Sequence, residues 1–156
     1  MVRVAQYRGL SLISKTIKLT TGGPYSHTAI VLEEDFIVEA WHTTNRVRVV
    51  RGFDDGHTPS TPVDIYTVDL TEEEERRFRE FVIDQVGKRY DFLGVFGFHL
   101  ATRLHRRGRW FCSELLGAAL AATGNKLYED LVPSKLSPNG VVGLPGFTKL
   151  DPEDKK

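Results

Sequence analysis

The sequence predicts an α+β fold in which an antiparallel β-sheet packs against helices gathered on one side. Two observations lead to this prediction. Short apolar runs separated by polar turns fill the first half of the chain, whereas the second half carries apolar residues at helical spacing, bounded by helix-start and helix-stop residues. The 156-residue chain is long enough to bury one core without cross-links. We therefore expect a single domain over residues 1–150 and a disordered tail over residues 151–156.

The first half is predicted to form a strand meander interrupted by one helix. The polar turn at residues 33–35 joins two apolar runs, so the strands on either side of it are expected to be neighbours in the sheet. A short helix is expected over residues 11–20, with Ile13 and Ile17 one turn apart and a Gly-Gly-Pro stop at residues 22–24. The expected strands cover residues 2–7, 27–32, 36–41, 46–50 and 63–68.

The second half is predicted to be mainly helical. Thr71 and Glu74 match a capping box at the start of a helix, and Gly87 ends the apolar stripe that follows. Gly124 marks the end of a later helix in the same way. The other segments expected here are helices over residues 91–104 and 112–123, and an ordered coil over residues 133–146.

The composition argues against several classes of function. Lys plus Arg and Asp plus Glu both total 21, so the chain has no net charge that would attract nucleic acid. The one basic cluster, residues 103–109, is typical of a solvated helix end, although it could contact an anionic group. No stretch approaches the ~20 apolar residues that a membrane-spanning helix needs, and the N-terminus lacks the features of a signal peptide. We therefore expect a protein made in the cytoplasm without a transmembrane segment.

Cys112 is the first candidate for chemistry. It is the only cysteine, so no disulfide can form within the chain, which suits a reducing compartment. It is predicted to open a helix, where unpaired backbone N–H groups favour negative charge, lower the pKa of a thiol and could bind an oxyanion. The alternative is a buried structural cysteine that acts as a small hydrophobe. The position at a helix start favours the nucleophile.

His27 and Glu39 are the candidate partners of this cysteine. Histidine titrates near neutral pH and can accept a thiol proton, and His27 opens an apolar strand after a turn. Glu39 interrupts the neighbouring apolar strand, where a buried carboxylate is costly without a partner such as a histidine ring N–H. The alternatives are that His27 bonds a backbone carbonyl and that Glu39 faces solvent on an open side of the sheet.

The remaining histidines are weaker candidates. His42 has the opposite strand parity to Glu39, so both can face one cleft only if the strand has ended there. His57 lies in a loop expected to be exposed, and His99 and His105 lie on or near the second predicted helix. No pair of these residues has a recognised metal-ligand spacing, so neither a metal nor another cofactor is expected.

Four segments resemble the circularly permuted branch of the NlpC/p60 superfamily, which includes YiiX- and YycO-like proteins and is related to lecithin–retinol acyltransferase-like proteins. These segments are residues 25–31 (YSHTAIV), 38–40 (VEA), 90–92 (YDF) and 111–115 (FCSEL). In ordinary members of the superfamily the cysteine precedes the histidine, whereas in this branch the histidine comes first, then a polar residue, then the cysteine. The present chain has the second order, and the resemblance covers residues 6–142.

The resemblance implies a permuted papain-like fold with a small barrel, and a cysteine peptidase or amidase that acts on bacterial cell-wall peptides. It implies Cys112 as nucleophile, His27 as general base and Glu39 as the residue that orients His27. It also makes Tyr25 and Tyr90 candidates to line a substrate cleft. The implied substrate is a small peptide, a cell-wall fragment or a lipid acyl group.

Two alternatives stay open on the sequence. The same residues could serve an acyltransferase or lipid thioesterase, because the acceptor is chosen by cleft shape rather than by the catalytic pair. The chain could also be a non-catalytic, phage-associated binding module that keeps the fold. A cell-wall enzyme must also leave the cytoplasm; release through a phage pore, or a cytoplasmic amide or thioester substrate, would account for the absence of an export signal.

Overall fold

A computed structural model describes residues 1–33, 35–91 and 109–151 of the chain. The helix predicted over residues 91–104 and most of the tail predicted over residues 151–156 lie outside this described part. The elements in chain order are β1 (Val2–Tyr7), α1 (Leu12–Thr21), β2 (His27–Glu33), β3 (Phe36–Trp41), β4 (Arg46–Arg51), β5 (Val63–Val68), α2 (Glu72–Gln85), β6 (Arg89–Tyr90), β7 (Arg109–Trp110), α4 (Cys112–Ala122), the 3-10 helices η1 (Lys126–Tyr128) and η2 (Pro133–Lys135), α5 (Pro138–Val141) and β8 (Phe147–Lys149).

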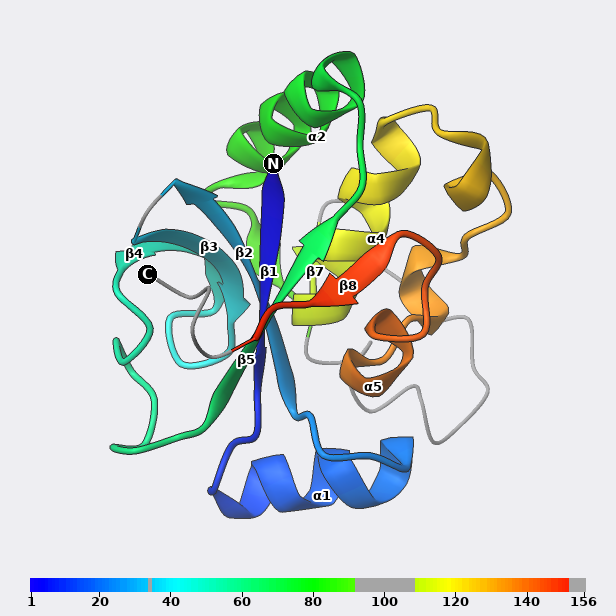
Figure 1. Cartoon of the computed structure of the whole chain (residues 1–156). Helices are drawn as coiled ribbons and strands as arrows, with labels where there is room; N and C mark the ends of the chain where they lie inside the picture. The colour runs from blue at the N-terminus through cyan, green and yellow to red at the C-terminus, as the bar shows by residue number, and fades with distance from the viewer. Residues whose placement is uncertain (34, 92–108, 152–156) are drawn as a thin grey trace.

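The strands form one curled sheet in the order β7-β6-β4-β3-β2-β1-β5-β8. The meander predicted from the first half is confirmed, because β2, β3 and β4 are antiparallel neighbours joined by short turns. The expectation of a wholly antiparallel sheet is wrong at one edge, where β6 and β7 run parallel. Figure 1 shows α2 at one end of the long strands and α1 at the other end, where β1 finishes and β2 begins.

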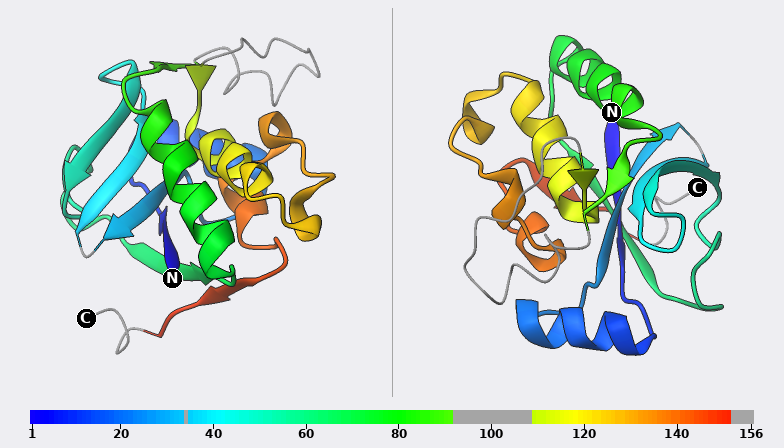
Figure 2. Two further views of the ribbon diagram at one scale, coloured as in Figure 1. Left: turned by 90° about the horizontal axis from the view of Figure 1, so that it is seen from above. Right: turned by 180° about the vertical axis from the view of Figure 1, so that it is seen from behind.

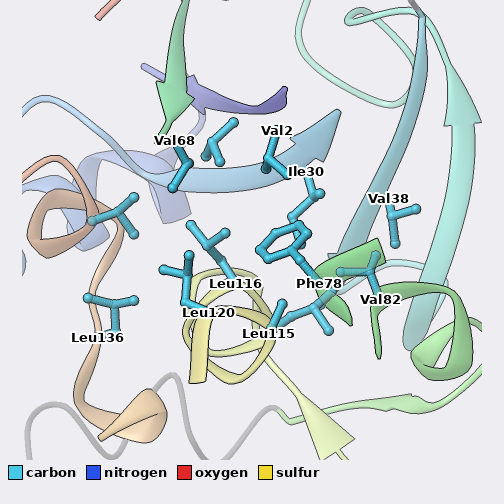
Figure 3. Close-up of a cluster of buried hydrophobic side chains, with 14 of the residues drawn as sticks. Val2, Ile30, Val38, Val68, Phe78, Val82, Leu115, Leu116, Leu120 and Leu136 are labelled. Carbon is cyan, nitrogen blue, oxygen red and sulfur yellow. The ribbon is translucent and has the colours of Figure 1, made fainter. Parts of the chain in front are cut away.

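The two faces of the sheet bury different apolar clusters, because side chains alternate along each strand. One face packs against α2 and α4, and its cluster includes Ile30, Phe78 and Leu116 (Figure 3). The other face lines the inside of the curl, where Tyr7 and Ile37 belong to a second cluster. The views in Figure 2 show α2 and α4 lying together beside the sheet. The predicted α+β architecture with its helices on one side is therefore confirmed for these two helices.

The helices begin and end at or next to the capping residues that the sequence predicts. The Thr71 hydroxyl accepts from the Glu74 backbone N–H, and the Glu74 carboxylate accepts from the Thr71 backbone N–H, so the predicted capping box is present. The residue that caps the end of α1 is Gly22, whose φ of 70° is a left-handed conformation that a glycine, having no Cβ, adopts without strain. The third predicted helix is confirmed as α4, which begins at Cys112.

The last part of the chain differs from the prediction of an ordered coil over residues 133–146. Two short helices, η2 and α5, form there, and Ser137 caps α5 by accepting from the Gly140 backbone N–H. Strands β6, β7 and β8 were also not predicted, because two or three residues are too few for an alternating pattern to appear. In the described residues, no helix combines the length and the hydropathy that a membrane crossing requires.

Candidate active site

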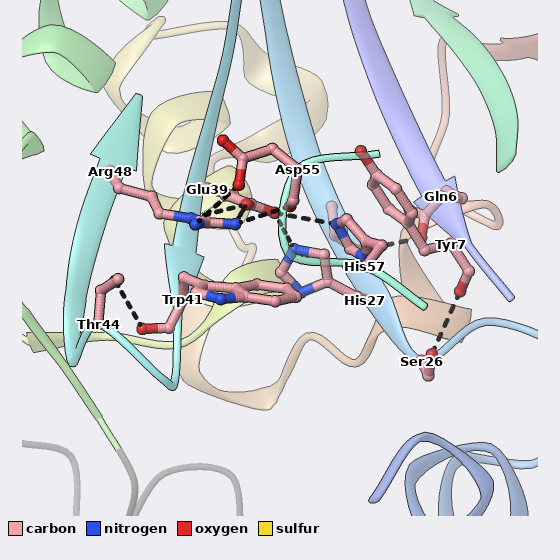
Figure 4. A network of polar contacts seen from close by, with 11 residues as sticks. Gln6, Tyr7, Ser26, His27, Glu39, Trp41, Thr44, Arg48, Asp55 and His57 are labelled. Carbon is pink, nitrogen blue, oxygen red and sulfur yellow. Dashed lines mark hydrogen bonds and ion pairs between the residues drawn. The ribbon is translucent and has the colours of Figure 1, made fainter. Parts of the chain in front are cut away.

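His27 and Glu39 are brought together by the β2–β3 hairpin. Ile30 pairs with Val38 in this hairpin, and continuing that pairing by one residue places Glu39 on the same sheet face as His27. The His27 Nε2–H donates to Glu39 Oε2 over 2.6 Å (Figure 4). The Glu39 side chain is only 1% exposed, so the alternative in which it faces solvent is wrong.

Arg48 neutralises the other oxygen of this buried carboxylate. It lies directly opposite Glu39 in the β3–β4 ladder, and its Nε and Nη2 atoms donate to Glu39 Oε1 over 3.0 and 2.6 Å. Burial would raise the pKa of Glu39, but its contacts with His27, His57 and Arg48 hold that pKa far below its usual value. Glu39 is therefore an anion, which fixes the His27 ring and supports positive charge on it.

The sequence predicted that His57 lies in an exposed loop, but its side chain is buried. Its side chain is only 8% exposed, and its ring stacks on Tyr7 with centroids 3.8 Å apart and planes 4° apart. Its Nε2 lies 3.6 Å from Glu39 Oε2. The loop between β4 and β5 thus folds back over the sheet and delivers a second histidine to the same carboxylate (Figure 4). The prediction failed because stacking on a residue 50 positions away leaves no local pattern in the loop.

Cys112 opens α4, whose residues pack against β2, β3 and α2. Cys112 is 7% exposed and forms no disulfide. Burial opposes ionisation of Cys112, but the charge of His27, a hydrogen bond with His27 and the backbone N–H groups of Thr28 and Ser113 outweigh it and lower the pKa of the thiol. The larger of these contributions come from His27, and the start of α4 adds the backbone N–H of Ser113.

The same contacts act on His27 in the opposite direction. Burial would lower the pKa of its ring, but the charge and hydrogen bond of Cys112 and those of Glu39 raise this pKa to about 10. Since Nε2 is bonded to Glu39, Nδ1 is the ring nitrogen left for the sulfur. The lowered pKa of the thiol and the raised pKa of the ring favour an ion pair of thiolate and imidazolium near neutral pH.

The two tyrosines proposed to line a cleft fall in different places. The Tyr25 hydroxyl bonds Asp64 and Tyr66 over 2.8 and 2.9 Å, so it is directed to β5 rather than to the cysteine. Tyr90 lies near the thiol: burial, then the charge of Cys112, raises the pKa of its hydroxyl well above the ordinary value. Of the two, Tyr90 is the one whose hydroxyl is influenced by the charge of Cys112.

The other histidines are placed as follows. His42 comes one residue after β3 ends, and its ring contacts Trp41 with centroids 5.1 Å apart. Burial and the nearby charge of His27 lower the pKa of His42. His99 and His105, with residues 103–108 of the basic cluster, lie outside the described residues.

Reasoning from sequence missed three members of this site. Arg48 could have been found, because the β3–β4 hairpin places it opposite Glu39. Tyr7 and Trp41 flank His27 with ring centroids 5.5 and 5.1 Å away. Both are large aromatic residues at strand ends, and they resemble ordinary core residues until the strands are paired.

A thiolate facing an oriented imidazolium can attack a carbonyl carbon, and we expect its ionisation to be measurable. The protein is first treated with EDTA to remove metal ions. The rate at which iodoacetamide alkylates Cys112 should then rise with pH in proportion to the fraction of thiolate, and the midpoint of this rise should lie at a pH well below the ~8.5 of a free thiol. In His27→Gln the buried thiol loses its cationic partner, so the midpoint should move to ~8.5 or above. N-acetylcysteine provides the control; identical midpoints in the wild type and His27→Gln would contradict the ion pair.

Comparison with known proteins adds one informative likeness. The fold is similar to that in the crystal structure of the metalloprotein yiiX from Escherichia coli O157:H7, with a TM-score of 0.69 and 20% sequence identity over 96% of this chain and 94% of that chain. The sequence matches no family profile, and no curated protein matches it. The likeness therefore establishes a yiiX-like fold over nearly the whole chain.

Proposed function

We propose that this protein is a cysteine hydrolase with a permuted papain-like active site, in which Cys112 is the nucleophile, His27 the general acid and base, and Glu39 the residue that orients His27. The proposal is carried by one observation. A single imidazole bonds a buried carboxylate through Nε2 and also interacts with a thiol at a helix start. That is the arrangement of nucleophile, base and orienting group that acyl transfer needs.

The reaction would proceed in two balanced steps. The Cys112 sulfur attacks the carbonyl carbon of an amide or ester, and the bond to the leaving nitrogen or oxygen breaks as His27 gives it a proton. A thioester on Cys112 results. Water then attacks this thioester while His27 takes the water proton, which passes to the departing sulfur or remains on the ring. The backbone N–H groups at the start of α4 would bind the transient oxyanion.

An acyl-enzyme experiment tests this proposal. The protein is incubated with an activated aryl ester, and its intact mass is followed with time. We expect an acyl adduct on Cys112 that forms and then decays as water releases the acid. The absence of any adduct on Cys112, with the thiol still reactive after denaturation, would favour the binding-module alternative.

A hydrolase and an acyltransferase differ in whether the acyl group on Cys112 passes to water or to another acceptor. Adding an amine or alcohol acceptor to the acylated protein should leave the decay rate unchanged if water is the preferred acceptor. Faster decay, with the acyl group recovered on the added acceptor, would assign the protein to acyl transfer. Both outcomes retain Cys112 as the nucleophile and differ only in the second step.

The metalloprotein neighbour raises the question of whether this chain's residues suit a metal ion. His27, Glu39 and His57 each offer a ligand atom, and these atoms lie within 4.8 Å of one another. The His57 Nε2 is buried and has no hydrogen-bond partner among the described residues, so the donor set fits a divalent cation. A bound ion of this kind would supply Lewis acidity, whereas the proposed cysteine reaction uses none.

A further inference from the structure

Three donor atoms converge on the buried side of the candidate active site. The Nε2 atoms of His27 and His57 lie 2.6 and 3.6 Å from the same oxygen, Oε2 of Glu39. The other oxygen of Glu39 is already held by Arg48. The carboxylate is thus oriented with Oε2 turned toward both rings (Figure 4).

The His57 ring indicates that this group has a ligand. Its side chain is more than nine-tenths buried, and stacking on Tyr7 fixes its plane. Its Nε2 makes no hydrogen bond within the described part of the chain and comes no closer than 3.6 Å to Glu39 Oε2, which is unfavourable for a buried polar group. A fixed, buried imidazole nitrogen aimed at a carboxylate and a second imidazole suits a metal ion, which would satisfy all three donors together.

We propose that the protein binds one Zn²⁺ ion through Nε2 of His27, Nε2 of His57 and Oε2 of Glu39. Two histidines and one glutamate form a known zinc ligand set, with bonds of about 2.0–2.2 Å that separate tetrahedral ligands by roughly 3.3 Å. The His57–Glu39 separation is already close to this value, so only the His27–Glu39 contact has to widen. Arg48 then acts on the ligand carboxylate from outside the coordination sphere, as such partners commonly do.

Zinc binding at this position opposes the cysteine reaction, a consequence that rests on the proposed function. The ion takes the place of the proton on His27 Nε2, and this proton is released to solvent. The hydrogen bond from His27 Nε2 to Glu39, which orients the ring in the proposed reaction, is then broken, and the ring has to move as this contact widens around the ion. Zinc is therefore a reversible inhibitor that acts through the histidine and its carboxylate rather than through the sulfur.

Zinc binding is measured directly by calorimetric titration of ZnCl₂ into the EDTA-treated full chain. We expect one ion per chain in the wild type, and affinity at least about tenfold weaker in His57→Phe, which keeps an aromatic ring against Tyr7 but removes the nitrogen. His57→Gln serves as a second variant if His57→Phe fails to fold. His42→Gln is the matched control, since it removes a neighbouring histidine that lies outside the ligand set.

Cys112→Ser separates this inference from the proposed function. It should bind zinc as the wild type does, because the sulfur is not a ligand, even though it cannot form a thioester. Absence of zinc binding by the wild type, unchanged affinity in both His57 variants, or loss of binding in Cys112→Ser would each overturn the site. Acylation of Cys112 without zinc tests the hydrolase alone, and loss of that acylation on adding zinc, restored by EDTA, tests the inhibition.

Discussion

Replacing Cys112 with Ala should abolish acylation of the protein by an activated ester, with a loss of at least about 10³-fold in rate. The reason is that no other side chain in the site can form the thioester, because this is the only cysteine of the chain. Cys112→Ser should be nearly as inactive, since a serine hydroxyl is far less acidic than a thiol beside His27. Intact-mass measurement of acyl adducts over time provides the comparison.

The fold should survive this substitution, because the side chain removed is small. Thermal unfolding of Cys112→Ala close to that of the wild type would confirm that chemistry rather than structure was lost. A matched control places a thiol elsewhere: Thr20→Cys, on the exposed side of α1, combined with Cys112→Ala. This exposed thiol has no imidazole partner, so it should acylate no faster than a free thiol. Undiminished acylation of Cys112→Ala would refute the proposed nucleophile.

Replacing Glu39 with Leu should lower the free energy of unfolding by about 1–3 kcal/mol, because it removes the carboxylate that His27 and the largely buried Arg48 share, while Arg48 keeps its contacts with Asp55. The Arg48 side chain is only 16% exposed, and both of its bonds to Glu39 would be lost. Glu39→Gln keeps the shape and one acceptor oxygen, so it should cost less. It should also reduce acylation less than the loss of Cys112 or His27, as expected of an orienting residue. Urea titration monitored by circular dichroism measures the stability changes.

A double variant shows whether the unpaired charge causes this loss. Glu39→Leu combined with Arg48→Met replaces this pair by apolar groups and should recover part of the stability, since His27 and His57 still lose their carboxylate partner. Asp35→Ala supplies the comparison at the surface, because the Arg51–Asp35 pair is exposed and should contribute little. If Glu39→Leu is no less stable than Asp35→Ala, the buried pair does not hold this part of the sheet together.

The sequence was sufficient to predict those features that depend on local pattern. Strands β1 to β5, the capping box at Thr71 and the helix beginning at Cys112 all follow from spacing, turn residues and caps within a few positions. The proximity of His27 and Glu39 was also predictable, because a short turn makes their strands neighbours and parity puts both on one face.

The features that escaped prediction depend on long-range contacts. His57 belongs to a loop whose burial is decided by stacking on Tyr7 in the first strand. Tyr25 was assigned to a cleft from the family resemblance, but its hydroxyl bonds Asp64 and Tyr66 on β5 instead. Side-chain direction at a strand start depends on which groups the rest of the fold supplies, and no local pattern records that.

Because β6 and β7 pair in parallel, the position of Cys112 does not depend on how many residues join these two strands. Arg89 pairs with Arg109, and Tyr90 with Trp110, so the chain leaves and rejoins the sheet at one point immediately before Cys112. Doubling the number of residues between such anchored ends costs only about 0.6 kcal/mol in closure entropy. Insertions or deletions between Tyr90 and Arg109 are therefore expected to leave the position of the Cys112 sulfur unchanged.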